Sequence, residues 1–157
     1  MKIDLRKLVI RPISNADKEA VLEIDRTVSG MERAGYIEAK FFRATEDKAQ
    51  LLNSLVVEHE GRVVGFVMGE IYLGEFGIPE DTATIDTIGV RPEFQRSGIG
   101  HLLLDEYKGH ALKAGVNRLH TLVDWNDWKL VHFFDSVGFS PAKTLSLEAR
   151  IGAGCKS

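Results

Sequence analysis

The sequence has one cysteine, no strong excess of either charge and no long hydrophobic run, and each shortage excludes a class of protein. A single thiol, Cys155, excludes an intrachain disulfide and a thiolate metal cluster. No stretch approaches the roughly 18 apolar residues of a membrane span, and the N-terminal segment lacks the apolar core of a secretory signal. We therefore expect a cytoplasmic protein without a membrane partner, frayed over its last few residues.

Charge and composition narrow the class further. The chain has 23 acidic and 20 basic residues, a formal charge of −3 and a pI near 6.0. Such a balance has no global attraction to nucleic acid, so none is expected as a partner. The five histidines show no metal-ligand spacing, and no metal is expected. A chain of 157 residues with 44% hydrophobic and 27% charged residues predicts one domain, residues 1–157, with a sizeable core.

The apolar pattern predicts strands and helices that follow one another along the chain. Turn residues at 60–62 predict a hairpin in the first half, whereas helices separate the later strands. The expected fold class is α/β, with a mixed, mostly antiparallel sheet and helices on both faces. Strands are expected at residues 7–11, 55–60, 63–73, 82–90, 116–124 and 144–151, and helices from 14 or 15 to 30 and at 34–52, 98–114 and 127–137.

Residues 85–100 are the segment that carries chemistry. A strand leads into a short loop and then into a glycine-bearing turn that opens a helix. Gly98 and Gly100 have no Cβ, and the first N–H groups of a helix have no internal partner, so a phosphate can approach closely. Gln95 and Arg96 add donors. The turn lacks the Gly-Lys-Ser/Thr of a P-loop and the third glycine of a dinucleotide site, and a plain tight turn is the alternative.

The wider pattern resembles the GCN5-related N-acetyltransferase (GNAT) family. The run Gln95-Arg96-Ser97-Gly98-Ile99-Gly100 is similar to the family's Q/R-x-x-G-x-G/A signature, and Thr87 to Pro92 is similar to the strand and V-x-P element before it. Asn126 and the run Phe133 to Phe139 resemble the second motif, and Arg11-Pro12 resembles the family's opening. The resemblance implies a GNAT fold with splayed middle strands and acetyl-CoA as cofactor.

The resemblance also assigns cofactor contacts. It implies that the pantetheine arm pairs with the backbone of Ile88, Gly89 and Val90, and that Asn126 and Phe134 line the lower pantetheine and the thiol. Phe134 stands where the family usually has a tyrosine that protonates the leaving thiolate. Water, Tyr36 or Tyr72 could replace that tyrosine, or catalysis could be slow or absent. The implied pyrophosphate contacts are Gln95, Arg96, Ser97, Gly98, Ile99, Gly100 and His101.

A carboxylate is expected to take the acceptor's proton, because only a neutral amine attacks a thioester. Neutralising a lysine-type amine near pH 7 costs about 4.6 kcal/mol, against about 1–1.4 kcal/mol for an α-amino group. Asp86 is the first candidate, since it lies in the cofactor strand two residues before Ile88 and by alternation shares its face. A structural Asp is an equal alternative. Glu75 and Asp124 are second choices, although Asp124 is more readily a helix N-cap.

The sequence therefore predicts an acetyl-CoA-dependent N-acetyltransferase that acts on a small-molecule or peptide amine by direct attack in a ternary complex. Acidic residues near the site weakly favour a cationic amine. A non-catalytic acyl-CoA sensor or partner module is the main alternative, and an O-acyl or longer-chain acyltransferase is another. The resemblance leaves a homodimer open. Trp125 and Trp128 are expected in the core rather than in an acceptor pocket, and residues 75–79 form either a wall of that pocket or a simple connection.

Overall fold

The computed structural model describes residues 2–46, 54–72 and 82–152, and the statements below concern these residues. The chain divides into two units, residues 1–124 and residues 125–157. The expectations at Glu75, at residues 75–79, at Cys155 and at the end of the 34–52 helix lie outside the described residues, as does the side chain of Tyr72.

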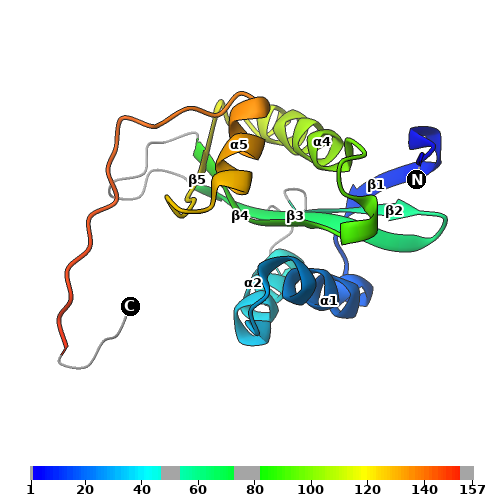
Figure 1. The fold of residues 1–157 in the computed structure, drawn as a ribbon, viewed down its shortest axis with the longest axis horizontal. Coiled ribbons are helices and arrows are strands. Elements are labelled where there is room, and N and C mark those ends of the chain that lie inside the picture. The colour runs from blue at the N-terminus through cyan, green and yellow to red at the C-terminus, as the bar shows by residue number, and fades with distance from the viewer. Residues whose placement is uncertain (1, 47–53, 73–81, 153–157) are drawn as a thin grey trace. The chain divides into compact units, whose positions relative to one another are not determined.

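The first unit contains a five-stranded mixed sheet in the order β1-β2-β3-β4-β5 (Figure 1). Neighbouring strands from β1 to β4 are antiparallel, and β5 is parallel to β4. This arrangement confirms the mixed, mostly antiparallel sheet. The strands are β1 (Leu8–Pro12), β2 (Leu55–His59), β3 (Arg62–Tyr72), β4 (Thr82–Val90) and β5 (Arg118–Thr121).

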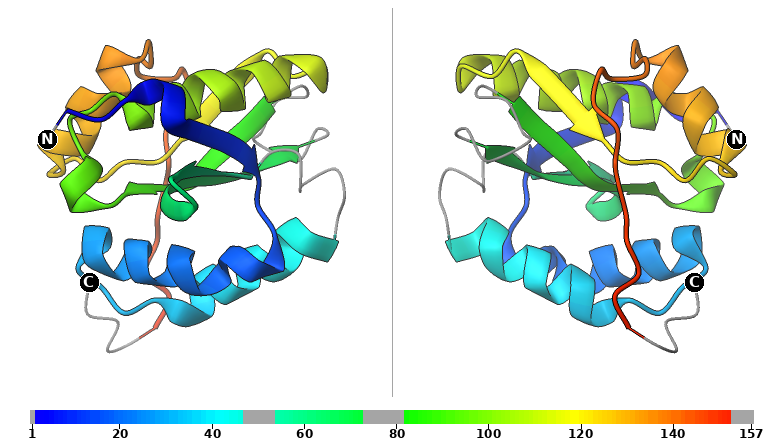
Figure 2. Two further views of the ribbon diagram at one scale, coloured as in Figure 1. Left: turned by 90° about the vertical axis from the view of Figure 1, so that its right-hand side faces the viewer. Right: turned by 90° about the vertical axis from the view of Figure 1, so that its left-hand side faces the viewer.

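Helices cover both faces of this sheet (Figure 2). Helices α1 (Lys18–Ser29) and α2 (Ala34–Glu46) lie on one face, and α4 (Ile99–Lys113) lies on the other. The α1–α2 side buries Ile24, Phe41 and Phe66 in one cluster, whereas α4 buries Leu103 and Leu104. Two apolar layers therefore hold the sheet from either side, as the sequence pattern predicts.

Turn chemistry fixes the ends of several elements. Gly30 ends α1 with a left-handed φ of 68°, a conformation that glycine adopts without steric cost. Glu60 and Gly61 both have positive φ and join β2 to β3, with His59 opposite Arg62. A two-residue turn with two positive φ angles matches the twist of a hairpin. The hairpin expected at residues 60–62 is confirmed.

The second unit, residues 125–157, contains α5 (Trp128–Ser136). Asp127 is its N-cap, because its side chain accepts a hydrogen bond of 3.2 Å from the Leu130 N–H. The expectation that Asp124 caps this helix is therefore wrong. Trp125 and Trp128 are 86% and 65% exposed, so the expectation that they belong to the core is also wrong.

The strand expected at 144–151 is absent from the described residues, which run there as an extended chain without a strand partner. Leu145, Leu147 and Ile151 are 85–99% exposed. An alternating pattern predicts one apolar face, but a strand also needs a neighbour for its backbone hydrogen bonds. The pattern alone does not supply that neighbour.

None of the described helices is both long and apolar enough to cross a membrane. Within the described ranges, no three His, Cys, Asp or Glu side chains are grouped closely enough to hold a metal ion.

Candidate active site

Strand β4 is paired along its whole length on one side only. Its first four residues, Thr82–Ile85, pair with β5, and that ladder ends where Ile85 lies opposite Thr121. Among the described strands, none pairs with residues 88–90 on the β5 side, while β3 pairs with them on the other. The backbone that the resemblance assigns to the pantetheine arm therefore has an open edge. A ligand with its own amides could add to that edge as a strand does.

Strand β4 also carries a bulge, and Asp86 is its extra residue. Thr87 lies opposite Met68, and Ile85 lies opposite the next residue of β3, Gly69. A bulge leaves one residue outside the ladder and re-aims its side chain. The side chain of Asp86 reaches α2, where its Oδ2 lies 2.8 Å from the Nζ of Lys40.

The bulge overturns the expectation that Asp86 and Ile88 share a face. Ile88 pairs with Val67, two residues along β3 from Gly65. A Cβ on Gly65 would contact Leu103 of α4, so Gly65, Val67 and Ile88 all face α4. Asp86 faces α2 on the opposite side. Strict alternation fails here because one added residue exchanges the faces of all those beyond it.

Asp86 belongs to a small ionic cluster between α2 and the sheet. The ammonium group of Lys40 also lies 3.3 Å from Glu70 Oε1, and that oxygen lies 3.1 Å from Arg43 Nη1. Thr84 donates a hydrogen bond of 2.9 Å to Asp86 Oδ1. The side chains of Lys40, Glu70 and Asp86 are only 14–17% exposed, so water screens these charges weakly. We call Lys40, Glu70 and Asp86 the ionic cluster.

The charges of the cluster affect its titratable groups. Burial is the largest single influence on Lys40 and would lower its pKa, but the hydrogen bond to Asp86 and the nearby negative charges of Asp86 and Glu70 together raise the pKa above its ordinary value. The nitrogen of Lys40 lies 5.6 Å from the centre of the Tyr36 ring. Burial, opposed by Lys40, raises the pKa of the Tyr36 hydroxyl. Tyr36 therefore keeps its proton at neutral pH.

The loop from Gln95 to His101 lies shortly after the end of β4. A one-turn helix, η3 (Pro92–Phe94), leads into it, and α4 begins at Ile99. Arg96 and Gly98 have φ angles of 60° and 89°, so the backbone turns sharply twice before the helix starts. A Cβ on Gly98 would meet no atom within 4 Å, so the space beside this helix N-terminus is open. The geometry fits an anion such as a pyrophosphate.

Side-chain hydrogen bonds shape this loop. Gln95 Nε2 donates to the carbonyl oxygen of Val90 at 2.9 Å, which ties the loop back to the end of β4. Ser97 Oγ donates to the carbonyl oxygen of Phe94. The side chain of Ile99 is buried, whereas Gln95, Arg96 and His101 are exposed. Ile99 can thus reach a ligand through its backbone alone.

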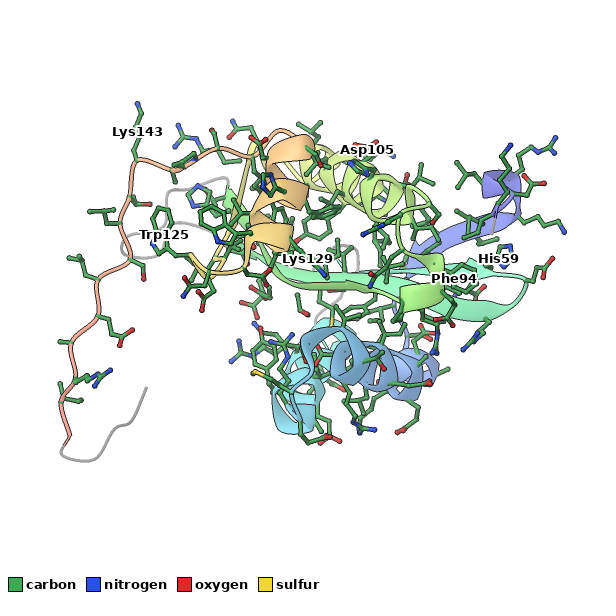
Figure 3. All side chains as sticks on the ribbon, viewed as in Figure 1. His59, Phe94, Asp105, Trp125, Lys129 and Lys143 are labelled. Atoms are coloured by element: carbon green, nitrogen blue, oxygen red, sulfur yellow. The ribbon has the colours of Figure 1, made fainter. Side chains whose placement is uncertain are left out.

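Two residues outside the expected site support the loop. Arg91 is 8% exposed; its Nε donates to the carbonyl oxygen of Val63 at 2.9 Å and its Nη2 donates to Glu23 Oε2 at 3.0 Å. The ring of Phe94 lies 5.4 Å from that of His59 (Figure 3). The sequence offers one signal for Arg91, an arginine directly between a strand and a proline. It offers none for the partners of either residue, which lie far away along the chain.

Asn126 and Phe134 belong to the other unit. The Phe134 ring packs edge-on against those of Phe133 and Phe139, at centroid distances of 5.3 Å and 5.0 Å. Asn126 is exposed just before α5, and Asp124 is exposed at the end of the first unit.

Comparisons with known proteins agree on one family. The sequence model of the acetyltransferase (GNAT) family matches residues 19–139. A mycothiol acetyltransferase of Propionibacterium freudenreichii subsp. shermanii is 30% identical over 103 residues, which make up 65% of this chain and 32% of that protein. The chain thus spans about a third of the length of that curated relative.

Solved structures share the fold at low sequence identity. The aminoglycoside N-acetyltransferase AAC(6')-Iy, solved with a coenzyme A bisubstrate analogue, has a TM-score of 0.77 and 13% identity, with 92% of this chain and 99% of that chain covered. A ribosomal-protein-alanine N-acetyltransferase from Brucella melitensis has a TM-score of 0.70 and 18% identity, with 92% and 99% covered. The expected fold is therefore confirmed. With the family model matching well over half of its length, the chain belongs to the acetyltransferase (GNAT) family.

Proposed function

We propose that the protein is an acetyl-CoA-dependent N-acetyltransferase that acetylates a primary amine by direct attack in a ternary complex. The observation that carries this proposal is the continuity of one segment. The open edge of β4 at residues 88–90 is followed, after the one-turn helix η3, by the loop 95–101 at the start of α4, and a carboxylate lies at the bulge just before that edge. Coenzyme A carries a pantetheine arm that can pair like a strand, followed by a pyrophosphate, which is the order of the strand edge and the loop.

Each part of the site has one role in this proposal. Acetyl-CoA supplies a thioester whose carbonyl carbon accepts the amine. The backbone of Ile88, Gly89 and Val90 orients the pantetheine arm, and the N–H groups from Gln95 to His101 hold the pyrophosphate. Asp86 takes one proton from the ammonium form of the acceptor, and the neutral nitrogen then attacks. As the N–C bond forms and the thioester C–S bond breaks, the second proton that the nitrogen loses passes to the departing thiolate. The products are an amide and coenzyme A, with no covalent enzyme intermediate.

The leaving thiolate needs no tyrosine at position 134. A thiol with a pKa near 8.5 is already a fair leaving group, and water can protonate it afterwards. Tyr36 is a second proton donor for the thiolate in this proposal. Burial raises the pKa of its hydroxyl, and its ring lies beside Lys40 of the ionic cluster.

The acceptor in this proposal is a small-molecule or protein amine. Two kinds of structural neighbour support that breadth: by name, one group acetylates aminoglycosides and another acetylates an alanine of a ribosomal protein. We also propose a homodimer, supported by the exposed apolar side chains at 145, 147 and 151.

A second candidate function is a non-catalytic acyl-CoA sensor. Two observations favour it: a phenylalanine stands at position 134, and Lys40 already pairs with the proposed base, Asp86. Both functions need coenzyme A to bind, and they differ in turnover.

The experiment measures free thiol released from acetyl-CoA across a panel of alkylamines, polyamines, aminoglycosides and peptides, alongside coenzyme A binding by calorimetry. Amine-dependent thiol release supports the enzyme. Coenzyme A binding without release for any amine selects the sensor. A folded protein that binds no coenzyme A contradicts both.

A further inference from the structure

The Lys40 side chain links α2 to two strands at once. Its ammonium nitrogen lies 2.8 Å from Asp86 on β4 and 3.3 Å from Glu70 on β3. All three side chains are at least four-fifths buried. An ammonium ion therefore already occupies the space beside the proposed base.

The two carboxylates of the ionic cluster are not equally dependent on Lys40. Glu70 Oε1 also pairs with Arg43 at 3.1 Å, and Arg43 is 66% exposed at the rim. Asp86 receives a neutral hydrogen bond from Thr84 as its other polar contact. If Lys40 shifts towards Glu70, Asp86 loses its cation while Glu70 keeps two. A second ammonium ion can then take the vacated place on Asp86.

The chemistry at Asp86 makes this exchange necessary. The carboxylate must hydrogen-bond the acceptor nitrogen to receive its proton. While Lys40 holds Oδ2, that oxygen is already occupied by a group of the same kind as a protonated acceptor. A charged amine can displace Lys40 because it restores the ion pair, whereas a hydroxyl or an uncharged arylamine leaves a poorly screened carboxylate without a cation.

We propose that Lys40 is a specificity-determining residue of the acceptor site: its ammonium group occupies the position on Asp86 that the acceptor's ammonium takes, and it thereby selects alkylamines that are charged at neutral pH over hydroxyl and arylamine acceptors. This inference rests on the proposed function, because it uses Asp86 as the base. Lys40 acts through Asp86, and the Tyr36 ring 5.6 Å from its nitrogen offers the incoming cation an aromatic face.

The test compares three variants. Lys40→Met keeps the length of the side chain and removes its charge. We expect it to lower KM for a charged alkylamine at least about tenfold, since a hydrogen bond to a charged group no longer has to be broken, with little change in kcat. Lys40→Arg is expected to restore the wild-type KM. Arg43→Met, one turn away on α2, removes a cation that pairs with Glu70 at the rim, and it is expected to leave KM unchanged.

A second measurement needs no acetyl transfer. Calorimetry with n-butylammonium chloride is expected to show binding to Lys40→Met at least about tenfold tighter than to the wild type or to Arg43→Met. Equal KM values and equal butylammonium affinities in wild type and a folded Lys40→Met would overturn the role of Lys40, even if amines are acetylated. If butylammonium binding differs as expected but no amine is acetylated by any variant, the exchange at Asp86 stands and the proposed enzyme does not.

Discussion

Asp86 has the contacts of a structural residue and the position of a catalytic base. Its contacts with Lys40 and Thr84 are those of a structural anchor, whereas its place at a bulge beside an open strand edge is typical of a functional residue. Glu70 is its natural comparison, because Glu70 also contacts Lys40 but lies within the regular ladder, opposite Thr84.

Replacing each of these carboxylates by its amide separates the two roles. Asp86→Asn is expected to lower turnover by about 10²–10⁴-fold, because a positioned base is lost, with coenzyme A affinity unchanged. Glu70→Gln, which weakens the same lysine contact, is expected to retain most of the turnover. Thiol-release kinetics and calorimetry on both variants make the comparison. Equal losses of turnover would assign Asp86 a structural role and place the base elsewhere.

Asp17 is a carboxylate whose role is purely structural. It is 3% exposed and receives two hydrogen bonds of 2.7–2.8 Å from Arg11 and one of 2.8 Å from the Ser14 N–H. Burial alone would raise the pKa of Asp17, but these donors outweigh burial and lower the pKa below its ordinary value of 3.8. Its ionised form therefore stabilises the junction between β1 and α1.

The direction of that pKa shift fixes a pH dependence. Because the folded-state pKa of Asp17 lies below the unfolded value, its stabilisation is complete above about pH 4 and is lost as the pH falls through the folded pKa. Asp17→Asn is expected to reduce the free energy of unfolding by about 1–3 kcal/mol at pH 7 and to flatten its decline below pH 4. Urea unfolding between pH 3 and pH 7 measures both effects.

Glu60→Gln is the matched control, since Glu60 pairs with Lys7 at 2.9 Å on the open surface. Little change in stability is expected there. An Asp17→Asn variant that unfolds with the wild-type pH dependence would show that the Arg11 contact contributes nothing to acid stability.

The bounds of strands and helices depend on the local sequence pattern, and the sequence predicts several of them. The bounds of β4 are as expected at residues 82–90, because β-branched residues dominate that stretch, and Gly98 is the N-cap of α4, one residue before its first turn. The bulge at Asp86 was not predictable, because it arises from the pairing of β4 with β3. The contact of Lys40 with Asp86 likewise joins residues 46 positions apart, and no local signal in the sequence announces it.

The bulge also explains one glycine. A Cβ on Gly69 would overlap the carbonyl oxygen of Thr84 and the hydroxyl of Tyr107, and that hydroxyl donates to the same carbonyl at 2.7 Å. Gly69→Ala is expected to destabilise the fold by about 1–3 kcal/mol, because backbone must move to admit the methyl group. Gly109→Ala, in the open interior of α4, is expected to stabilise it by about 0.5–1 kcal/mol. Thermal unfolding of both variants checks the contrast, and equal effects would contradict the close approach at Gly69.

The loop before α4 is tested by adding a side chain where the backbone tolerates one. Gly98 has a left-handed φ of 89°, so a valine there would strain the backbone, whereas asparagine adopts this region more readily. Gly98→Asn is expected to weaken coenzyme A binding at least about tenfold, the effect of one lost charged hydrogen bond, by filling the open space beside the helix N-terminus.

Gly61→Asn is its control, because Gly61 has a φ of 81° and equally open surroundings in the β2–β3 turn. Calorimetry with coenzyme A compares the two variants. If a folded Gly98→Asn binds coenzyme A as tightly as Gly61→Asn does, the loop does not hold the pyrophosphate.

The whole molecule departs most clearly from its sequence pattern at residues 144–151, where a last strand was expected and none forms. Residues 144–151 alternate between apolar and polar side chains, the pattern of a strand with one buried face, yet Leu145 and Leu147 are 85% and 89% exposed. Polar residues at 146, 148 and 150 occupy the other face. The alternation of apolar and polar residues predicts which face such a strand buries, but it does not predict which other strand pairs with it.

The proposed homodimer gives that apolar face a partner, because an extended segment with one apolar face readily joins the edge of another chain's sheet. Light scattering is expected to give the wild type a mass of twice 17.5 kDa. Leu147→Asp places a charge on the apolar face and is expected to shift the mass towards 17.5 kDa, whereas Ser146→Asp places the same charge on the polar face and is expected to leave the dimer intact. A monomeric wild type would refute a dimer through residues 144–151, and so would equal dissociation of the two variants. Neighbouring positions of an extended segment point to opposite faces, so the two variants differ only if one of those faces is buried in the dimer.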